Sequence, residues 1–171
     1  MKTLLLLRHA KSAWNDSTIS DISRPLTPRG QIAATRIGRH LREEGPLPER
    51  VLCSPARRAA ETLARVLAEL KPPPVVEERP ELYLQGWSSL LAAARSLPEE
   101  VKRAMVVSHN PDLPDLALAL AGTGPAAALT ALATKFPTGA LAVLTFPVGT
   151  WREIAPGSGT LQALIRPRDL S

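Results

Sequence analysis

Cysteine, aromatic residues and long apolar runs are all scarce in this chain of 171 residues. The single cysteine, Cys53, can form neither an internal disulfide nor a cysteine-based metal site, which is typical of proteins in a reducing compartment. The leucine run at residues 4–7 is followed at once by Arg8 and His9, far short of the roughly 18 apolar residues that a membrane span requires. We therefore expect a cytoplasmic protein without a signal peptide or a transmembrane segment.

The charge of the chain is only moderately one-sided. Lysine and arginine total 21 against 16 acidic residues, a net charge of +5 that suits an anionic partner in general. Aromatic residues make up 4% of the chain, however, and neither zinc-finger spacing nor another nucleic-acid reading motif accompanies the charge. We expect neither nucleic acid nor a membrane as a partner.

The hydrophobic pattern predicts alternating strands and helices. Short apolar runs at residues 3–7, 50–53, 104–107 and 140–146 are typical of buried strands. Helical spacing covers residues 29–44, 57–70 and 87–97, and a further helix ends near Gly122. We expect a single domain over residues 1–171 of the α/β class, with three α/β/α layers and a mostly parallel central sheet that has an antiparallel edge.

Turns and caps refine these boundaries. Thr27-Pro28 and Ser54-Pro55 each place a hydroxyl-bearing cap residue before a proline in the first helical position, and Gly45 follows the first helix. The turn at residues 147–149 predicts an edge hairpin completed by a strand at 151–154, with an irregular tail after it.

Polar residues follow three of the predicted strands. Arg8-His9 follows the first strand, Arg58 lies just beyond the second, and His109 follows a third. Ligands of open α/β sheets bind beyond the carboxyl ends of the strands, so these side chains should meet there. Arg57 and Arg58 open a predicted helix, where the dipole disfavours cations unless an anion also binds. The pattern therefore predicts an anion site.

The strings around these residues resemble the histidine phosphatase superfamily, which includes the phosphoglycerate mutases, and within it the SixA-type phosphohistidine phosphatases. Arg8-His9-Ala10 resembles the family's Arg-His-Gly opening, with alanine in place of glycine. The remaining matches follow in the family's order, namely Arg24-Pro25-Leu26-Thr27-Pro28-Arg29-Gly30, Ser54-Pro55-x-x-Arg58 and Ser108-His109-Asn110-Pro111. The resemblance covers residues 4–120 and implies a phosphoglycerate mutase-like fold.

The resemblance also implies a set of catalytic residues. His9 is the nucleophile; Arg8, Arg58 and His109 form the phosphate pocket, and Asn15 is a further substrate contact. A neutral imidazole can attack phosphorus, and a covalent phosphohistidine that water then hydrolyses divides the transfer into two easier steps. Two arginines and a protonated His109 would neutralise the phosphoryl oxygens, so this chemistry requires no metal or other cofactor.

The neighbouring cations should affect the pKa values of the two histidines and therefore the pH dependence of activity. Arg8 and Arg58 should lower the pKa of His9, whereas bound phosphate should raise that of His109. We expect an activity optimum on the mildly acidic to neutral side. Other polar residues near the opening motif, Asp21 among them, are interpreted as solvated loop residues, and His40 as a helix residue without a catalytic role.

The acid for the leaving group is less well marked. In mutases and many phosphomonoesterases of the superfamily, a glutamate protonates the leaving oxygen. Glu81 is the candidate for this substrate contact here, but its spacing to Trp87 differs from that of the family segment, and Ser88 follows Trp87. A phosphoramidate with an imidazole leaving group depends less on an enzymic acid. We therefore expect a protein phosphohistidine as substrate. The alternatives are a small phosphorylated metabolite, processed by a phosphomonoesterase or mutase, and a non-catalytic phosphate-binding module.

Overall fold

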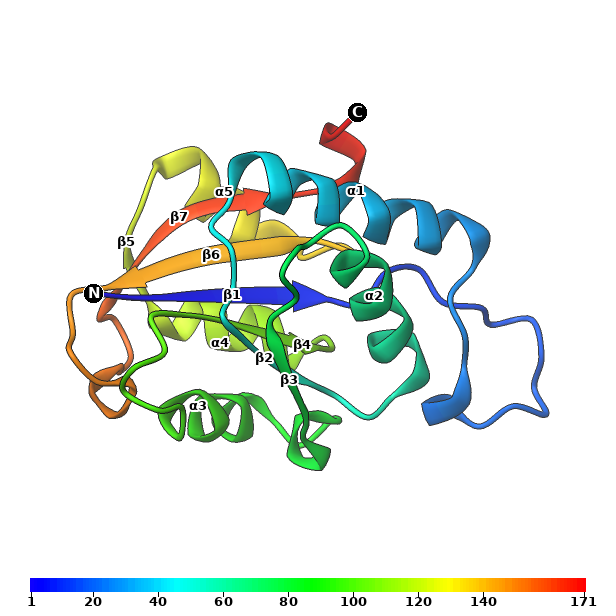
Figure 1. Ribbon diagram of the computed structural model, residues 1–171, viewed down its shortest axis with the longest axis horizontal. Helices are drawn as coiled ribbons and strands as arrows, with labels where there is room; N and C mark the ends of the chain where they lie inside the picture. The colour runs from blue at the N-terminus through cyan, green and yellow to red at the C-terminus, as the bar shows by residue number, and fades with distance from the viewer.

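Seven strands form one sheet at the centre of the molecule (Figure 1), in the order β3-β2-β4-β1-β6-β7-β5. The computed structural model describes residues 1–171. The strands are β1 (Lys2–Arg8), β2 (Arg50–Cys53), β3 (Val75–Glu78), β4 (Arg103–Ser108), β5 (Ala121–Thr123), β6 (Leu141–Phe146) and β7 (Gly159–Ile165). Only β6 is antiparallel to its neighbours, β1 and β7. The expected α/β class with a mostly parallel sheet is confirmed, and the reversed strand lies inside the sheet instead of at its edge.

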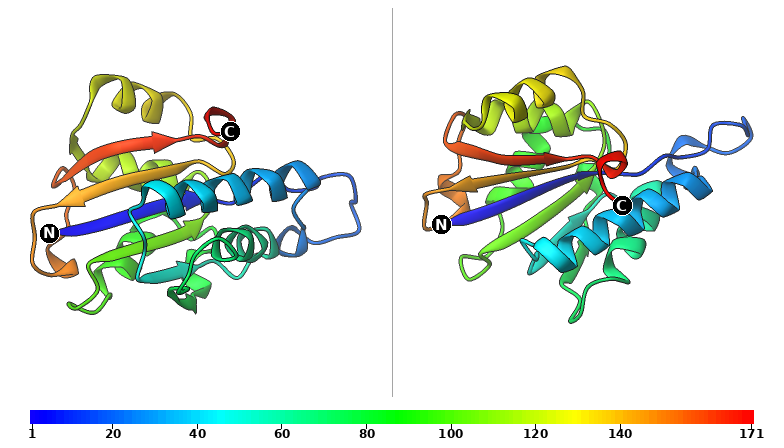
Figure 2. Two further views of the ribbon diagram at one scale, coloured as in Figure 1. Left: turned by 45° about the horizontal axis from the view of Figure 1, so that its top comes forward. Right: turned by 90° about the horizontal axis from the view of Figure 1, so that it is seen from above.

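Helices cover both faces of this sheet, which gives the expected three layers. They are α1 (Pro28–Glu44), α2 (Arg57–Leu67), α3 (Trp87–Arg95), α4 (Asp112–Leu120) and α5 (Ala126–Thr134). Alternate leucines of β1 point to opposite faces. Leu5 and Leu7 share a core cluster with Ile37 of α1, whereas Leu4 and Leu6 share another with Leu116 of α4. Figure 2 shows α1 and α2 on one side of the sheet and α5 on the other.

The start of α1 agrees with the sequence, whereas that of α2 does not. Thr27 caps α1, because its hydroxyl accepts a hydrogen bond from the Gly30 N–H. Helix α2 begins at Arg57 with Ala56 before it, so Ser54 is not its cap. The Ser54 hydroxyl instead lies 2.7 Å from Nε2 of His109. The side chain that looked like a cap therefore belongs to the neighbourhood of a candidate catalytic histidine.

The predictions for the strands after β6 and for β3 were wrong or missing. The predicted strand at residues 151–154 is a 3-10 helix, η3 (Trp151–Glu153), because the buried Trp151 indole donates to the carbonyl of Val101. The true partner of β6 is β7, within the predicted irregular tail. Strand β3 escaped prediction because it is an edge strand whose Val75 and Val76 side chains are exposed.

The parallel strands bring the predicted site residues to one end of the sheet. In the register of the sheet, Arg8 at the end of β1 pairs with Ser108 at the end of β4. Cys53 at the end of β2 pairs with Val107. The loop between β1 and α1 extends outward from this same end, away from the N-terminus (Figure 1). None of the helices has both the length and the apolar character to cross a membrane.

Candidate active site

A cavity of about 290 Å³ opens at the carboxyl ends of β1, β2 and β4. The structure brings His9, Arg8, Arg58 and His109 together in its wall. The full lining is Arg8, His9, Lys11, Ser12, Trp14, Asp21, Arg24, Arg58, Leu84, His109, Asn110 and Thr138. Four cationic residues against one carboxylate make this cavity suited to an anion.

The His9 ring is buried and held in one orientation. Its Nδ1 lies 2.7 Å from the carbonyl oxygen of Ala10, so Nδ1–H donates there and Nε2 is left with a free lone pair. The Ala10 backbone is itself fixed, because its N–H donates to the Thr62 hydroxyl over 2.9 Å. The lone pair on Nε2 is what a nucleophile at this position requires.

The surroundings keep the His9 ring neutral. Burial lowers the pKa of His9 to about 4, with further lowering by the charges of Arg58, Arg8 and Arg24 and opposition from the hydrogen bond to Ala10. The expected direction is thus confirmed, with burial as the largest cause. At neutral pH the imidazole carries no proton on Nε2 and can attack an electrophile.

The two arginines present unsatisfied donors. Arg8 donates through Nη1 to the Phe136 carbonyl at 3.1 Å, and Arg58 donates through Nη1 to the Asp21 carbonyl at 2.7 Å. The Nε of each guanidinium is buried without a hydrogen-bond partner. Buried charged donors left unpaired are costly, so an anion with several oxygens would stabilise this arrangement.

His109 lies beside His9, with a distance of 5.2 Å between the ring centroids. Its Nε2 shares a hydrogen bond with the Ser54 hydroxyl, and its Nδ1 is buried without a hydrogen-bond partner. Burial, followed by the charge of Arg58, lowers the pKa of His109 to about 3. His109 is therefore neutral before an anion enters, and the protonated form implied by the family resemblance requires the added negative charge of a phosphoryl group.

Asp21 is a site residue that the sequence interpretation missed. Its carboxylate accepts hydrogen bonds from Arg58 and Arg24, each at 3.1 Å, and from the hydroxyl of Tyr83. Burial acts to raise the pKa of Asp21, but the Tyr83 hydrogen bond and the Arg58 charge lower it to about 2. No local pattern could reveal the contact with Arg58, because the two residues lie 37 positions apart.

Arg24 is the second missed residue. It occurs within a string that resembles the family, yet only the structure shows its side chain buried in the cavity wall. Its Nη1 donates to the Ser12 hydroxyl at 2.8 Å, and its guanidinium carbon lies 3.5 Å from the ring centre of Trp14. The exposed indole of Trp14 thus forms part of the cavity rim.

Two predicted substrate contacts lie elsewhere. Asn15 is exposed on the loop after Trp14 and does not line the cavity. Glu81 belongs to the 3-10 helix η2 (Pro80–Leu82), where its carboxylate pairs with Arg79, also outside the cavity. The only carboxylate in the cavity wall is therefore that of Asp21, which is ionised at neutral pH.

Comparisons with known proteins agree with this geometry. The family model of the histidine phosphatase superfamily (branch 1) matches residues 4–116. An uncharacterised protein of Mycobacterium leprae is 37% identical over 166 residues, which cover 95% of this chain and all of that protein. A SixA structure from Nakamurella multipartitia has a TM-score of 0.85 at 32% identity and covers 97% of this chain and 96% of its own. A protein histidine phosphatase SixA complexed with tungstate has a TM-score of 0.75 at 29% identity, with 99% of both chains covered.

Proposed function

Because the chain belongs to the histidine phosphatase superfamily and is a phosphatase, we propose that it hydrolyses phosphohistidine on a protein through a covalent intermediate on His9. The observation that carries the choice of substrate is the lack of a protonated carboxylic acid in the cavity wall. Asp21 is held ionised, and Glu81 pairs with Arg79 outside the cavity. An alkoxide leaving group needs such an acid, whereas an imidazole leaving group needs it much less.

The first step is the transfer of the phosphoryl group to the enzyme. Nε2 of His9 forms a bond to phosphorus while the bond from phosphorus to the substrate imidazole breaks, and that imidazole takes a proton from water. Arg8 and Arg58 would bind the phosphoryl oxygens through guanidinium donors, among them the Nε atoms that have no hydrogen-bond partner within the protein. His109 would take up a proton as the negative charge enters.

The second step frees the enzyme. A water molecule forms a bond to phosphorus while the bond to Nε2 of His9 breaks, and inorganic phosphate leaves. The hydrogen bond from Nδ1 to Ala10 keeps the ring in the same orientation through both steps. The pairing of Arg58 and Arg24 with Asp21 is available again once phosphate has left.

Trapping of the phosphoenzyme tests the proposal. Wild-type protein incubated with a protein labelled on phosphohistidine should acquire an acid-labile label, and His9→Ala should acquire none. His40→Ala is the matched control and should label like the wild type, because His40 lies on α1 away from the cavity. Retained hydrolysis by His9→Ala would overturn the assignment of the nucleophile.

The choice of substrate needs a separate comparison. We expect kcat/KM for phosphohistidine proteins to exceed that for alkyl phosphates by about 100-fold or more, since a general acid is typically worth that much. Alkyl phosphates turned over as fast as phosphohistidine would support a small-molecule phosphomonoesterase instead.

A further inference from the structure

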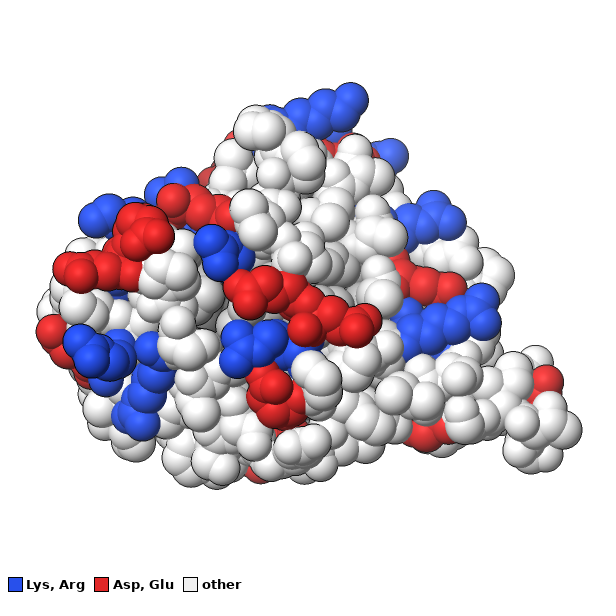
Figure 3. Space-filling model, turned by 60° about the horizontal axis from the view of Figure 1, so that its bottom comes forward, with Lys and Arg blue, Asp and Glu red and all other residues white.

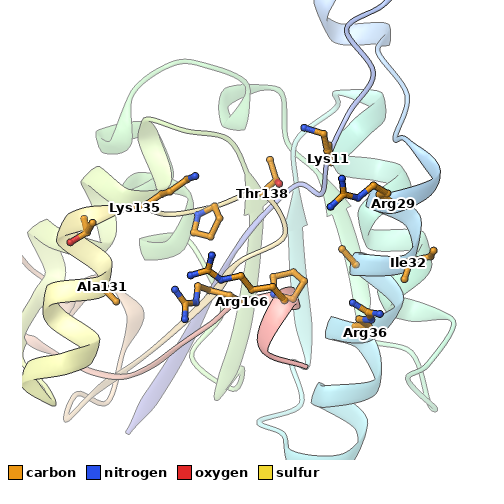
Figure 4. Close-up of a pocket in the computed structure, with 13 residues that line it drawn as sticks. Lys11, Arg29, Ile32, Arg36, Ala131, Lys135, Thr138 and Arg166 are labelled. Carbon is orange, nitrogen blue, oxygen red and sulfur yellow. The ribbon is translucent and has the colours of Figure 1, made fainter. Parts of the chain in front are cut away.

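A second, larger cavity of about 600 Å³ lies beside the catalytic one. We call it the basic groove. It runs between α1 and the end of α5, and its floor includes the 3-10 helix η4 (Pro167–Asp169) (Figure 4). Its lining contains six cationic residues and no acidic one: Lys11, Arg29, Arg36, Lys135, Arg166 and Arg168. Lys11 and Thr138 line both cavities, so the two adjoin each other.

Most cations of the basic groove have no side-chain partner. Arg166 pairs with Asp169 at 2.8 Å, but the other five form no ion pair and no side-chain hydrogen bond. Elsewhere many arginines pair with carboxylates, as Arg50 does with Glu77, and basic and acidic side chains are interspersed on the face in Figure 3. The mutual repulsion of the five unpaired cations is unfavourable unless an anion binds among them.

The shape of the groove favours a small anion over a protein surface. Lys11, Arg29 and Arg36 approach from one side and Lys135 from the other, so their charges converge on one hollow (Figure 4). Its volume lies in the range of small-molecule sites. Most of the cations are arginines, whose planar donors match phosphate oxygens in pairs. Ile32, with 55% of its surface exposed, adds an apolar patch to one wall.

We propose that the basic groove binds a small molecule carrying several linked phosphate groups, such as inorganic tripolyphosphate or a nucleoside triphosphate. This site is separate from hydrolysis at His9 and does not depend on it. Five unpaired cations exceed what one phosphate monoester needs, and they match the four to five negative charges of such a chain. An acidic protein segment would instead be expected to spread its contacts over a flatter surface.

Calorimetric titration of the full-length His9→Ala protein with tripolyphosphate and with ATP in EDTA tests this proposal, because that variant cannot consume the probe through His9. The groove variant is Arg36→Glu with Lys135→Glu, from opposite walls and outside the catalytic cavity. The control, Lys102→Glu with Arg152→Glu, changes the net charge equally at exposed positions outside both cavities. The groove variant should raise Kd for both probes by about tenfold or more. The control should change it by about twofold at most in 0.15 M salt.

Each remaining outcome is decisive. Tighter binding of ATP than of tripolyphosphate supports the proposal with a nucleoside contact, and equal binding supports it with the phosphate chain alone. Kd values that the groove variant leaves unchanged would place the anion in the catalytic cavity and overturn the proposal. Tighter binding of a decaglutamate peptide than of tripolyphosphate, lost in the groove variant, would also overturn it in favour of protein docking.

Discussion

Lowering the pH from 7.5 to 5 should cost this protein a large part of its stability, because two buried histidines must stay neutral in the folded state. The pKa of His9 is lowered to about 4 and that of His109 to about 3, from an ordinary value of 6.5. As pH falls, the unfolded chain takes up these protons first. Stability is therefore retained above pH 6.5 and lost as pH falls from 6.5 towards the folded-state values.

The size of the effect follows from those pKa values. At pH 5 an unfolded histidine with a pKa of 6.5 is almost fully protonated, whereas the folded rings of His9 and His109 remain mostly neutral. Each ring then lowers the free energy of unfolding by about 2 kcal/mol relative to pH 7.5, and the two together by about 4 kcal/mol. The lowered pKa of Asp21, about 2, contributes nothing in this window, since its carboxyl is ionised in both states.

Urea unfolding in phosphate-free buffer at the two pH values measures this difference. His109→Gln should lose about half of the pH effect, because one of the two titrating rings is gone. His40→Gln is the matched control and should retain all of it, since His40 lies outside the cavity on the half-exposed side of α1. An unfolding free energy that changes by less than about 1 kcal/mol between the two pH values would refute the reasoning.

Two further predictions concern the frame of the catalytic cavity. Asp21→Asn should bind inorganic phosphate about fivefold more tightly by calorimetry, because a carboxylate 3.1 Å from Arg58 competes with the anion and its 42% exposed side chain limits the effect to about 1 kcal/mol. Weaker phosphate binding would contradict that role. Gly30→Ala should lower the free energy of unfolding by about 2 to 3 kcal/mol, because its Cβ would lie 2.2 Å from the Lys11 carbonyl oxygen. Gly149→Ala, with no atom within 4 Å of its Cβ, is the control and should change stability by about 0.5 kcal/mol at most in the same urea titration.

The sequence predicted the parts of the fold that depend on local signals. The apolar middle parts of β1 and β4, the Thr27 cap and the glycine after α1 all follow from residue type at short range. The prediction of a strand at residues 151–154 was wrong because the turn before them and their β-propensity favour a hairpin. The hydrogen bond that holds the buried Trp151 indole joins it to Val101, which is 50 positions away in the sequence. Such long-range packing leaves no mark on a single sequence.

The residues of the candidate site likewise fall into those that short-range sequence signals predict and those that only the folded chain brings together. His9, Arg8 and His109 were predictable because the ends of parallel strands meet at one edge of the sheet. The prediction of Arg58 also depended on the spacing of the family motif Ser54-Pro55-x-x-Arg58. Asp21 was unpredictable because its role comes from Arg58 and Tyr83, which the chain brings to it only after folding.

Asp21 and the two histidines limit the positive charge of a cavity that is rich in arginines. The Asp21 carboxylate pairs with Arg58 and Arg24, while His9 and His109 add no charge because both rings remain neutral. An entering phosphoryl group brings about two negative charges to the same donors. It can therefore displace the single carboxylate and draw a proton onto His109. The cavity is thus most strongly complementary to the dianion that the proposed transfer would bring into it.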